Sequence, residues 1–198
     1  MTKTLLIASE NPGKIEEIKA ILSIIDITVL SASDLNLTLN VRETGDTYAR
    51  NAQLKAFAYT KVSGLPSLAD DSGLEVDSLD GAPGLYSARF SPKPGATDAD
   101  RRSYLLQKLA GKPHPWTAHF HCTAVIAFPD QRLTEMTGRC DGIILPEERG
   151  SGGFGYDPIF YIPEHNATMA ELPSSIKNKI SHRARALQAM LPYIRENF

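Results

Sequence analysis

Residues 3–25 read KTLLIASENPGKIEEIKAILSII, an apolar run followed by a polar turn and an amphipathic segment. The run Lys3–Ala8 is typical of a short buried strand, and Asn11-Pro12-Gly13 interrupts it. Apolar residues then recur at helical spacing, at Ile15, Ile18, Leu22 and Ile25. This opening unit of strand, turn and helix favours a fold that mixes helices with a β-sheet.

The rest of the chain continues this alternation. We expect further strands at 27–30, 67–69, 116–128, 133–141 and 159–162, and helices at 46–63, 97–109 and 181–195. Asp46 or Thr47 can cap the first of these helices, Gly64 can end it, and Thr97 with Asp100 matches a capping box.

The two long strands surround Pro129-Asp130-Gln131 and are therefore expected to form an antiparallel hairpin. The prediction is a single α/β (mixed α+β) domain over residues 1–198, with a twisted mixed sheet and flanking helices. The hairpin is expected to form a second lobe, with a central cleft between the two lobes.

Composition and charge exclude several functional classes. Hydrophobic residues at 42% and charged residues at 22% are typical of a globular chain, and a net charge of −2 argues against a nucleic-acid polymer as partner. The apolar run Leu5–Ala8 is too short for a signal peptide, and no run approaches the length of a membrane span. We therefore expect a cytoplasmic chain with no membrane role, whose Cys122 and Cys140 are ordinary buried thiols.

Two segments carry chemistry suited to a triphosphate. The turn Ser9-Glu10-Asn11-Pro12-Gly13-Lys14 precedes a helix N-terminus, where free N–H groups and Lys14 favour phosphate, although it lacks the glycine and hydroxyl positions of a Walker loop. Asp70-Asp71-Ser72-Gly73 follows an apolar strand, and adjacent carboxylates of this kind suit Mg²⁺ or the activation of water.

Two later segments suit a base. Phe154, flanked by glycines in Gly152-Gly153-Phe154-Gly155-Tyr156-Asp157, is accessible enough to stack on a planar ring. Lys177, Lys179, His182 and Arg183 gather where the last helix is expected to begin, a position at which cations oppose the helix dipole unless an anionic or electron-rich ligand is present.

Each of the four segments also has a plain structural interpretation: a strand-to-helix turn, an acidic surface turn, a glycine-rich corner around a core phenylalanine, or a solvated basic patch. A zinc site is disfavoured, because His119 and His121 share one face of a strand while Cys122 points to the other.

Taken together and in this order, the motifs resemble the inosine triphosphate pyrophosphatase family, which acts on non-canonical purine nucleoside triphosphates. The resemblance runs from Leu6 to about Leu187. Besides the segments above, it rests on Glu43-Thr44-Gly45, Asn51-Ala52, Gly81-Ala82-Pro83-Gly84, Ser87-Ala88-Arg89 and Ile180-Ser181-His182-Arg183.

The resemblance implies a role for each motif. Residues 9–14 would hold the triphosphate, Asp71 would be general base and Mg²⁺ ligand, Asp70 would support the metal and Ser72 would contact substrate. Phe154 would stack on the purine, and Gly155, Tyr156 and Asp157 would complete the nucleoside site. Lys177, His182 and Arg183 would read the base edge. The family also implies an elongated, two-lobed fold and a homodimer.

Two positions depart from the family pattern. Arg42 stands where relatives often have a metal-binding acid, so either Glu43 substitutes or Asp71 works with fewer protein ligands and more water. Glu10 stands where many relatives have a small residue, so its carboxylate must point away from the phosphates or be screened by metal.

The expected reaction is hydrolysis of inosine, deoxyinosine or xanthosine triphosphate to the monophosphate and pyrophosphate. The purine 6-oxygen would be selected by cationic donors, and adenine, which carries an amino group there, would be rejected. A nucleotide-binding sensor without catalysis is the alternative.

Overall fold

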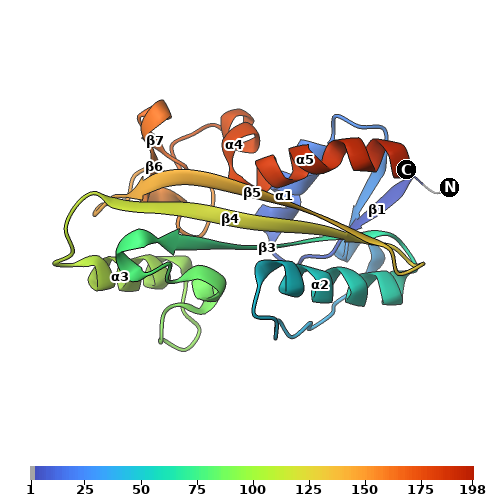
Figure 1. The fold of residues 1–198 in the computed structure, drawn as a ribbon, viewed down its shortest axis with the longest axis horizontal. Coiled ribbons are helices and arrows are strands. Elements are labelled where there is room, and N and C mark those ends of the chain that lie inside the picture. The colour runs from blue at the N-terminus through green and yellow to red at the C-terminus, as the bar shows by residue number, and fades with distance from the viewer. Residues whose placement is uncertain (1–2) are drawn as a thin grey trace. The chain divides into compact units, whose positions relative to one another are not determined.

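The computed structural model describes residues 3–198 (Figure 1). Seven strands form one mixed sheet in the order β2-β1-β3-β4-β5-β6-β7, which confirms the predicted α/β class. β1 pairs in parallel with β2 and β3, and β6 pairs antiparallel with β5 and β7. The strands are β1 (Thr4–Ile7), β2 (Thr28–Ser31), β3 (Ser67–Val76), β4 (Trp116–Ala127), β5 (Leu133–Ile144), β6 (Phe160–Ile162) and β7 (Ala167–Thr168).

Five α-helices accompany the sheet within residues 3–198: α1 (Pro12–Leu22), α2 (Tyr48–Ser63), α3 (Asp98–Leu109), α4 (Ser174–Ile180) and α5 (His182–Asn197). The predicted helix ends at Thr47, Gly64 and Thr97 are confirmed. Thr47 accepts a hydrogen bond from the Arg50 amide, Gly64 has φ +70°, and Thr97 and Asp100 form both bonds of the capping box. No helix in this part of the chain is long and apolar enough to cross a bilayer.

β3 is longer than predicted. The expected strand 67–69 continues through the acidic pair to Val76, because Leu74 and Val76 restore the alternation of buried apolar residues beyond Ser72-Gly73. The segment Asp70-Asp71-Ser72-Gly73 is therefore extended strand, and the interpretation as an acidic turn is wrong. α4 was not predicted, and it places Lys177 one helix earlier than His182 and Arg183.

The chain divides into two compact units. Unit 1 comprises the chain up to Asp71 together with Cys122–Gly138 and His182–Phe198, and unit 2 comprises Ser72–His121 and Arg139–Ser181. β3, β4 and β5 each contribute to both units. Both cysteines are free and buried, as predicted.

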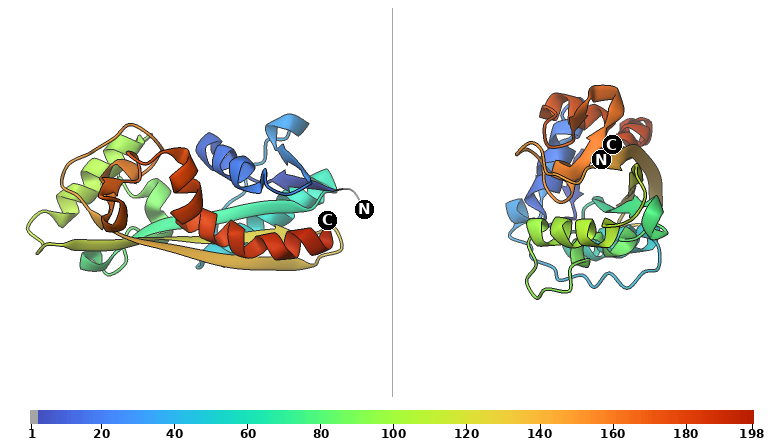
Figure 2. Two further views of the ribbon diagram at one scale, coloured as in Figure 1. Left: turned by 90° about the horizontal axis from the view of Figure 1, so that it is seen from above. Right: turned by 90° about the vertical axis from the view of Figure 1, so that its left-hand side faces the viewer.

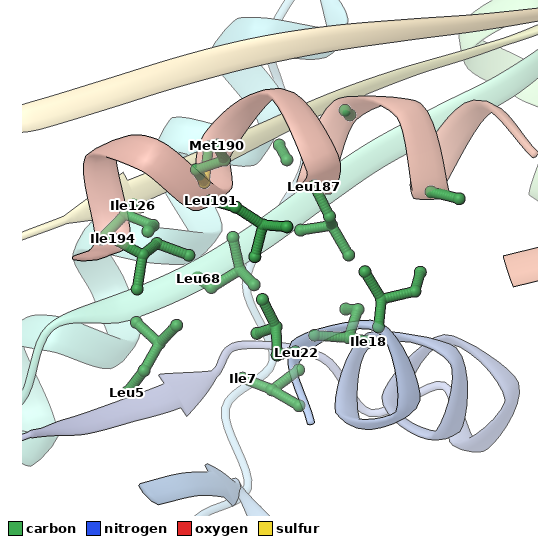
Figure 3. Close-up of a cluster of buried hydrophobic side chains, with 14 of the residues drawn as sticks. Leu5, Ile7, Ile18, Leu22, Leu68, Ile126, Leu187, Met190, Leu191 and Ile194 are labelled. Carbon is green, nitrogen blue, oxygen red and sulfur yellow. The ribbon is translucent and has the colours of Figure 1, made fainter. Parts of the chain in front are cut away.

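Unit 1 has a core on each face of its strands. On one face, side chains of α1 and α5 pack against Leu5, Ile7 and Leu68, as Figure 3 shows. On the other face, Ala52 and Ala56 of α2 pack against Leu6, Ala69 and neighbouring small residues. Figure 1 shows α5 and α2 on opposite sides of the strands. Successive residues of β3 therefore meet different helices.

Gly138 lets α5 lie directly against β5 (Figure 2). A Cβ at this position would lie 2.1 Å from the His182 carbonyl oxygen and 2.5 Å from the Ala186 nitrogen. This close approach fixes the first turn of α5, which carries His182 and Arg183.

Unit 2 is built around a second apolar cluster. Leu105 and Leu109 of α3 and Phe120 of β4 are buried there with Tyr156 and Phe160. The Tyr156 hydroxyl donates to the Ser87 carbonyl oxygen at 2.9 Å. The predicted site segment 154–157 is thus anchored in this core by its third residue.

Candidate active site

The acidic pair of β3 is split between the two faces of unit 1. The Asp70 side chain lies on the same face of β3 as Leu68, toward α1 and α5. The Asp71 side chain lies on the opposite face with Ala69, toward α2. Adjacent carboxylates are tolerated because cations lie beside both: Arg183 and Lys14 contact Asp70, and Lys55 contacts Asp71.

Asp70 lies in a buried ion cluster. Its Oδ2 is 3.0 Å from Lys14 Nζ and 3.0 Å from an Arg183 guanidinium nitrogen, and Arg183 also binds Glu17 of α1. The Asp70 and Arg183 side chains are each 1% exposed. Asp70 Oδ1 is buried without a hydrogen-bond partner. The cluster ties β3 to α1, through Lys14 and Glu17, and to α5, through Arg183.

Asp71 shares a second cluster with α2 and with Glu43. Asn51 donates to Asp71 Oδ2 at 3.1 Å and accepts the Gly45 amide at 2.8 Å, which joins the carboxylate to the Glu43-Thr44-Gly45 segment. Lys55 Nζ lies 2.7 Å from Glu43 Oε1 and 3.5 Å from Asp71 Oδ1. One ammonium group is thus shared by two carboxylates, and the three ionised groups keep one negative charge in excess.

The environments of the two aspartates move their pKa values apart. Burial opposes the ionisation of Asp70, but Arg183 and Lys14 outweigh it and hold the pKa well below its usual range. Burial dominates at Asp71 and raises its pKa, although Lys55 and Lys14 counter this. Such a separation is typical of a fixed anion beside a general base.

This separation gives a first prediction. In metal-free protein, Asp71 is expected to titrate above the ordinary aspartate value of about 3.9, and Asp70 below it. Carbon-13 NMR of the side-chain carboxyl carbons measures both, with Asp70→Asn and Asp71→Asn variants assigning the signals. The opposite order would contradict the roles inferred here.

The turn of residues 9–14 is built around Asn11. Its side chain caps α1 by accepting the Lys14 amide at 3.1 Å, and Ser9 Oγ accepts the Asn11 amide at 3.2 Å. Glu10 turns aside, because its carboxylate accepts the Leu39 amide at 3.2 Å. The sequence analysis expected the Glu10 carboxylate either to point away from residues that bind phosphate or to be screened by metal. The structure has it bound to the Leu39 amide.

Lys14 is the cation of this turn. Its side chain is 16% exposed, and burial lowers its pKa despite the attraction of Asp70. The N-terminal end of α1, with Pro12 and Gly13, and the Lys14 ammonium group therefore combine a helix dipole with a full charge. This combination suits a polyphosphate.

A second group of predicted residues converges in unit 2. Asp157 Oδ2 accepts the Phe154 amide at 2.8 Å and Lys177 Nζ at 2.5 Å. Lys177 Nζ also lies 4.9 Å from the centre of the Phe154 ring. A Cβ on Gly153 would lie 2.1 Å from the Asp157 carboxylate, so glycine is required for this packing. An aromatic ring, an ammonium group and a carboxylate are thereby held together.

The structure distributes the remaining predicted residues between the units. Tyr156 is a buried core residue of unit 2, and Ser72 is a partly buried residue of β3. His182 and Arg183 belong to unit 1 and are buried at the start of α5. Lys177, predicted in one basic group with His182 and Arg183, belongs to unit 2.

Comparison with known proteins identifies the chain. The model of the Ham1 family matches residues 5–193. The chain belongs to the Ham1 family. A protein of Geobacter sulfurreducens named dITP/XTP pyrophosphatase is 45% identical over 191 residues, which is 96% of each chain.

Solved Ham1 structures agree in fold. A HAM1 protein from Coxiella burnetii has a TM-score of 0.87 at 38% identity, over 99% of this chain and 100% of the other. The nucleoside-triphosphatase / dITP/XTP pyrophosphatase of Mycobacterium abscessus has a TM-score of 0.73 at 38% identity, over 96% and 99% of the two chains. The predicted resemblance, which ran the length of the chain, is confirmed.

Three residues of the candidate site were not identified as functional residues in the sequence analysis. Lys55 and Asn51 face Asp71 from one side of α2, and Glu17 faces Arg183 from α1. The spacing of four between Asn51 and Lys55 places both on one helix face and was the available signal. Nothing in the local sequence distinguishes Lys55 from a solvated helix lysine.

Proposed function

We propose that this chain hydrolyses non-canonical purine nucleoside triphosphates, namely inosine, deoxyinosine and xanthosine triphosphate, to the monophosphate and pyrophosphate. The observation that carries the proposal is the grouping of Asp71, Glu43, Lys55 and Lys14 in unit 1, beside a helix N-terminus. Its relatives named dITP/XTP pyrophosphatase, at about 45% identity over nearly their full length, support the same reaction.

We propose Mg²⁺ as the cofactor, held by Asp71 and Glu43, with Asp70 as its neighbour. The donor set fits a hard cation: Asp71 and Glu43 already share one cation, Lys55, and Asp70 Oδ1 is a buried oxygen without a partner. Among residues 3–198, no three or more acidic, histidine or cysteine side chains are arranged to hold a metal ion. Phosphate oxygens and water would complete the shell, as Mg²⁺ prefers.

The protein groups then have separate tasks. Lys14 and the Gly13 amide at the N-terminus of α1 bind the phosphate chain, and Lys55 adds a second positive charge. Asn51 orients the Asp71 carboxylate, which accepts the proton of the attacking water. Bound Mg²⁺ would supply further neutralisation of the phosphate charge. Asp70 stays ionised and holds Lys14 in place.

Base selection is assigned to unit 2. The Phe154 ring stacks on the purine, and Lys177, fixed by Asp157, donates to the 6-oxygen. Adenine offers an amino group at that position and leaves the ammonium group mispaired, at a cost of about 1–3 kcal/mol. Roles for His182, Arg183, Gly155, Tyr156 and Ser72 in contacting the substrate belong to the same proposal.

The test is pyrophosphate release from five nucleotides in the presence of Mg²⁺. Inosine, deoxyinosine and xanthosine triphosphates are expected to be hydrolysed with kcat/KM at least tenfold above that for adenosine triphosphate. Guanosine triphosphate shares the 6-oxygen, so its rate measures whether the 2-amino group is selected against separately. Equal rates for inosine and adenosine triphosphate would contradict the assignment of Lys177. Nucleotide binding without pyrophosphate release would favour the sensor.

We further propose a homodimer that works in the cytoplasm. The resemblance to the pyrophosphatase family supports the dimer. Light scattering coupled to size-exclusion chromatography measures the mass against 21.6 kDa for one chain.

A further inference from the structure

Gly155 is bound on both sides by helix α3. Its amide donates to Asp98 Oδ2 at 2.8 Å, and its carbonyl oxygen accepts Arg102 Nη1 at 2.7 Å. Asp98 is the first residue of α3, and Arg102 follows one turn later. The two side chains therefore hold the two peptide groups that flank Gly155, one shared with Phe154 and one shared with Tyr156.

Arg102 is itself held in a fixed orientation. Its Nε and Nη2 donate to the two carboxylate oxygens of Glu148 at 2.8 and 2.9 Å, a bidentate pair that leaves Nη1 for Gly155. The Arg102 side chain is only 11% exposed. Asp98 is braced by an ion pair with Arg101.

The segment needs such an external support. Gly155 has φ +61° and Gly153 has φ +71°, angles that glycine adopts readily, and glycine loses more backbone freedom on ordering than any other residue. Gly155 has no side chain that could pack, and a Cβ there would meet nothing within 4 Å. The contacts from α3 replace the missing side-chain packing.

We propose that Asp98 and Arg102, with Glu148, form a clamp that positions Phe154 and Asp157 for the nucleobase. The clamp holds the peptide immediately after Phe154, and Phe154 is hydrogen-bonded through its own amide to Asp157. These are positioning residues: they act on the base through Gly155 and do not contact it. The inference rests on the proposed function, because it takes Phe154 as the stacking platform.

The clamp predicts a loss of base affinity with unchanged phosphate affinity. Arg102→Met keeps the aliphatic stem and removes the guanidinium group. We expect about tenfold weaker binding of inosine monophosphate and a KM for inosine triphosphate raised by a similar factor, with kcat within twofold. Binding of tripolyphosphate, which has no base, should stay within twofold of wild type.

Calorimetric titration with inosine monophosphate and with tripolyphosphate measures both affinities. Lys108→Met is the matched control, since it removes one charge from the exposed far end of α3 and should change neither. Glu148→Gln changes a half-exposed side chain and should weaken the binding of inosine monophosphate about threefold. Arg102→Lys should restore part of the affinity, because lysine can still donate to the Gly155 carbonyl.

The outcomes separate the clamp from the proposed function. Wild-type protein that binds inosine monophosphate, together with variants Arg102→Met and Glu148→Gln that bind it equally well, contradicts the clamp alone. Wild-type protein that binds no inosine monophosphate contradicts the proposed function and the clamp with it. Variants that bind both inosine monophosphate and tripolyphosphate more weakly, by similar factors, would show general damage to the fold and would also contradict the clamp.

Discussion

Asp71→Asn is expected to lower kcat for inosine triphosphate by about 10²–10⁴-fold, the range lost with a general base. Asparagine keeps the size of the side chain and can still accept from Asn51, but it takes no proton from water and contributes one negative charge less beside Lys55. Steady-state pyrophosphate release measures kcat, and calorimetry with inosine monophosphate measures binding, which should survive.

Asp26→Asn is the control for this substitution, because Asp26 is a solvent-exposed carboxylate of unit 1 whose ion-pair partner is Lys3. It should leave kcat unchanged. If Asp71→Asn retains more than a tenth of the wild-type kcat, Asp71 is not the general base.

Arg183→Met should destabilise the protein by about 3–5 kcal/mol, since it leaves buried carboxylates without their shared guanidinium group. Asp70 and Glu17 both bind Arg183, and Lys14 alone would then face Asp70. Urea unfolding followed by circular dichroism measures the free energy of unfolding.

Two further variants sharpen this measurement. Arg185→Met removes an exposed arginine from the same helix and should cost less than about 1 kcal/mol. Adding Glu17→Gln to Arg183→Met should recover part of the loss, because one uncompensated charge disappears. A loss below 1 kcal/mol for Arg183→Met would contradict the account of the buried cluster.

Local signals in the sequence predicted the elements that local physics determines. The caps at Thr47 and Thr97 and the glycine at 64 were predictable, because each acts within one helical turn. The true end of β3 was missed because Asp-Asp-Ser-Gly is typical of a turn, whereas the burial of Leu74 and Val76 depends on tertiary packing. α4 has only seven residues and no side-chain cap, so no sequence pattern predicted it.

Most residues of the candidate site were predictable from the sequence, but which of them contact one another was not. The alternation of a strand places Asp70 and Asp71 on opposite faces, but the partners come from distant segments. Arg183 is 113 residues from Asp70 along the chain, and Gly155 is 53 residues from Arg102. Such contacts depend on how helices cover the sheet. A single sequence does not encode that arrangement in any local pattern.

The most direct test of the central claim is the identity of the products formed from inosine triphosphate and Mg²⁺. Phosphorus-31 NMR of the reaction distinguishes the two possible cleavages. The account predicts inosine monophosphate and pyrophosphate in equal amounts from the wild-type protein and almost none from Asp71→Asn. Inosine diphosphate with orthophosphate, or equal turnover by both proteins, would contradict it.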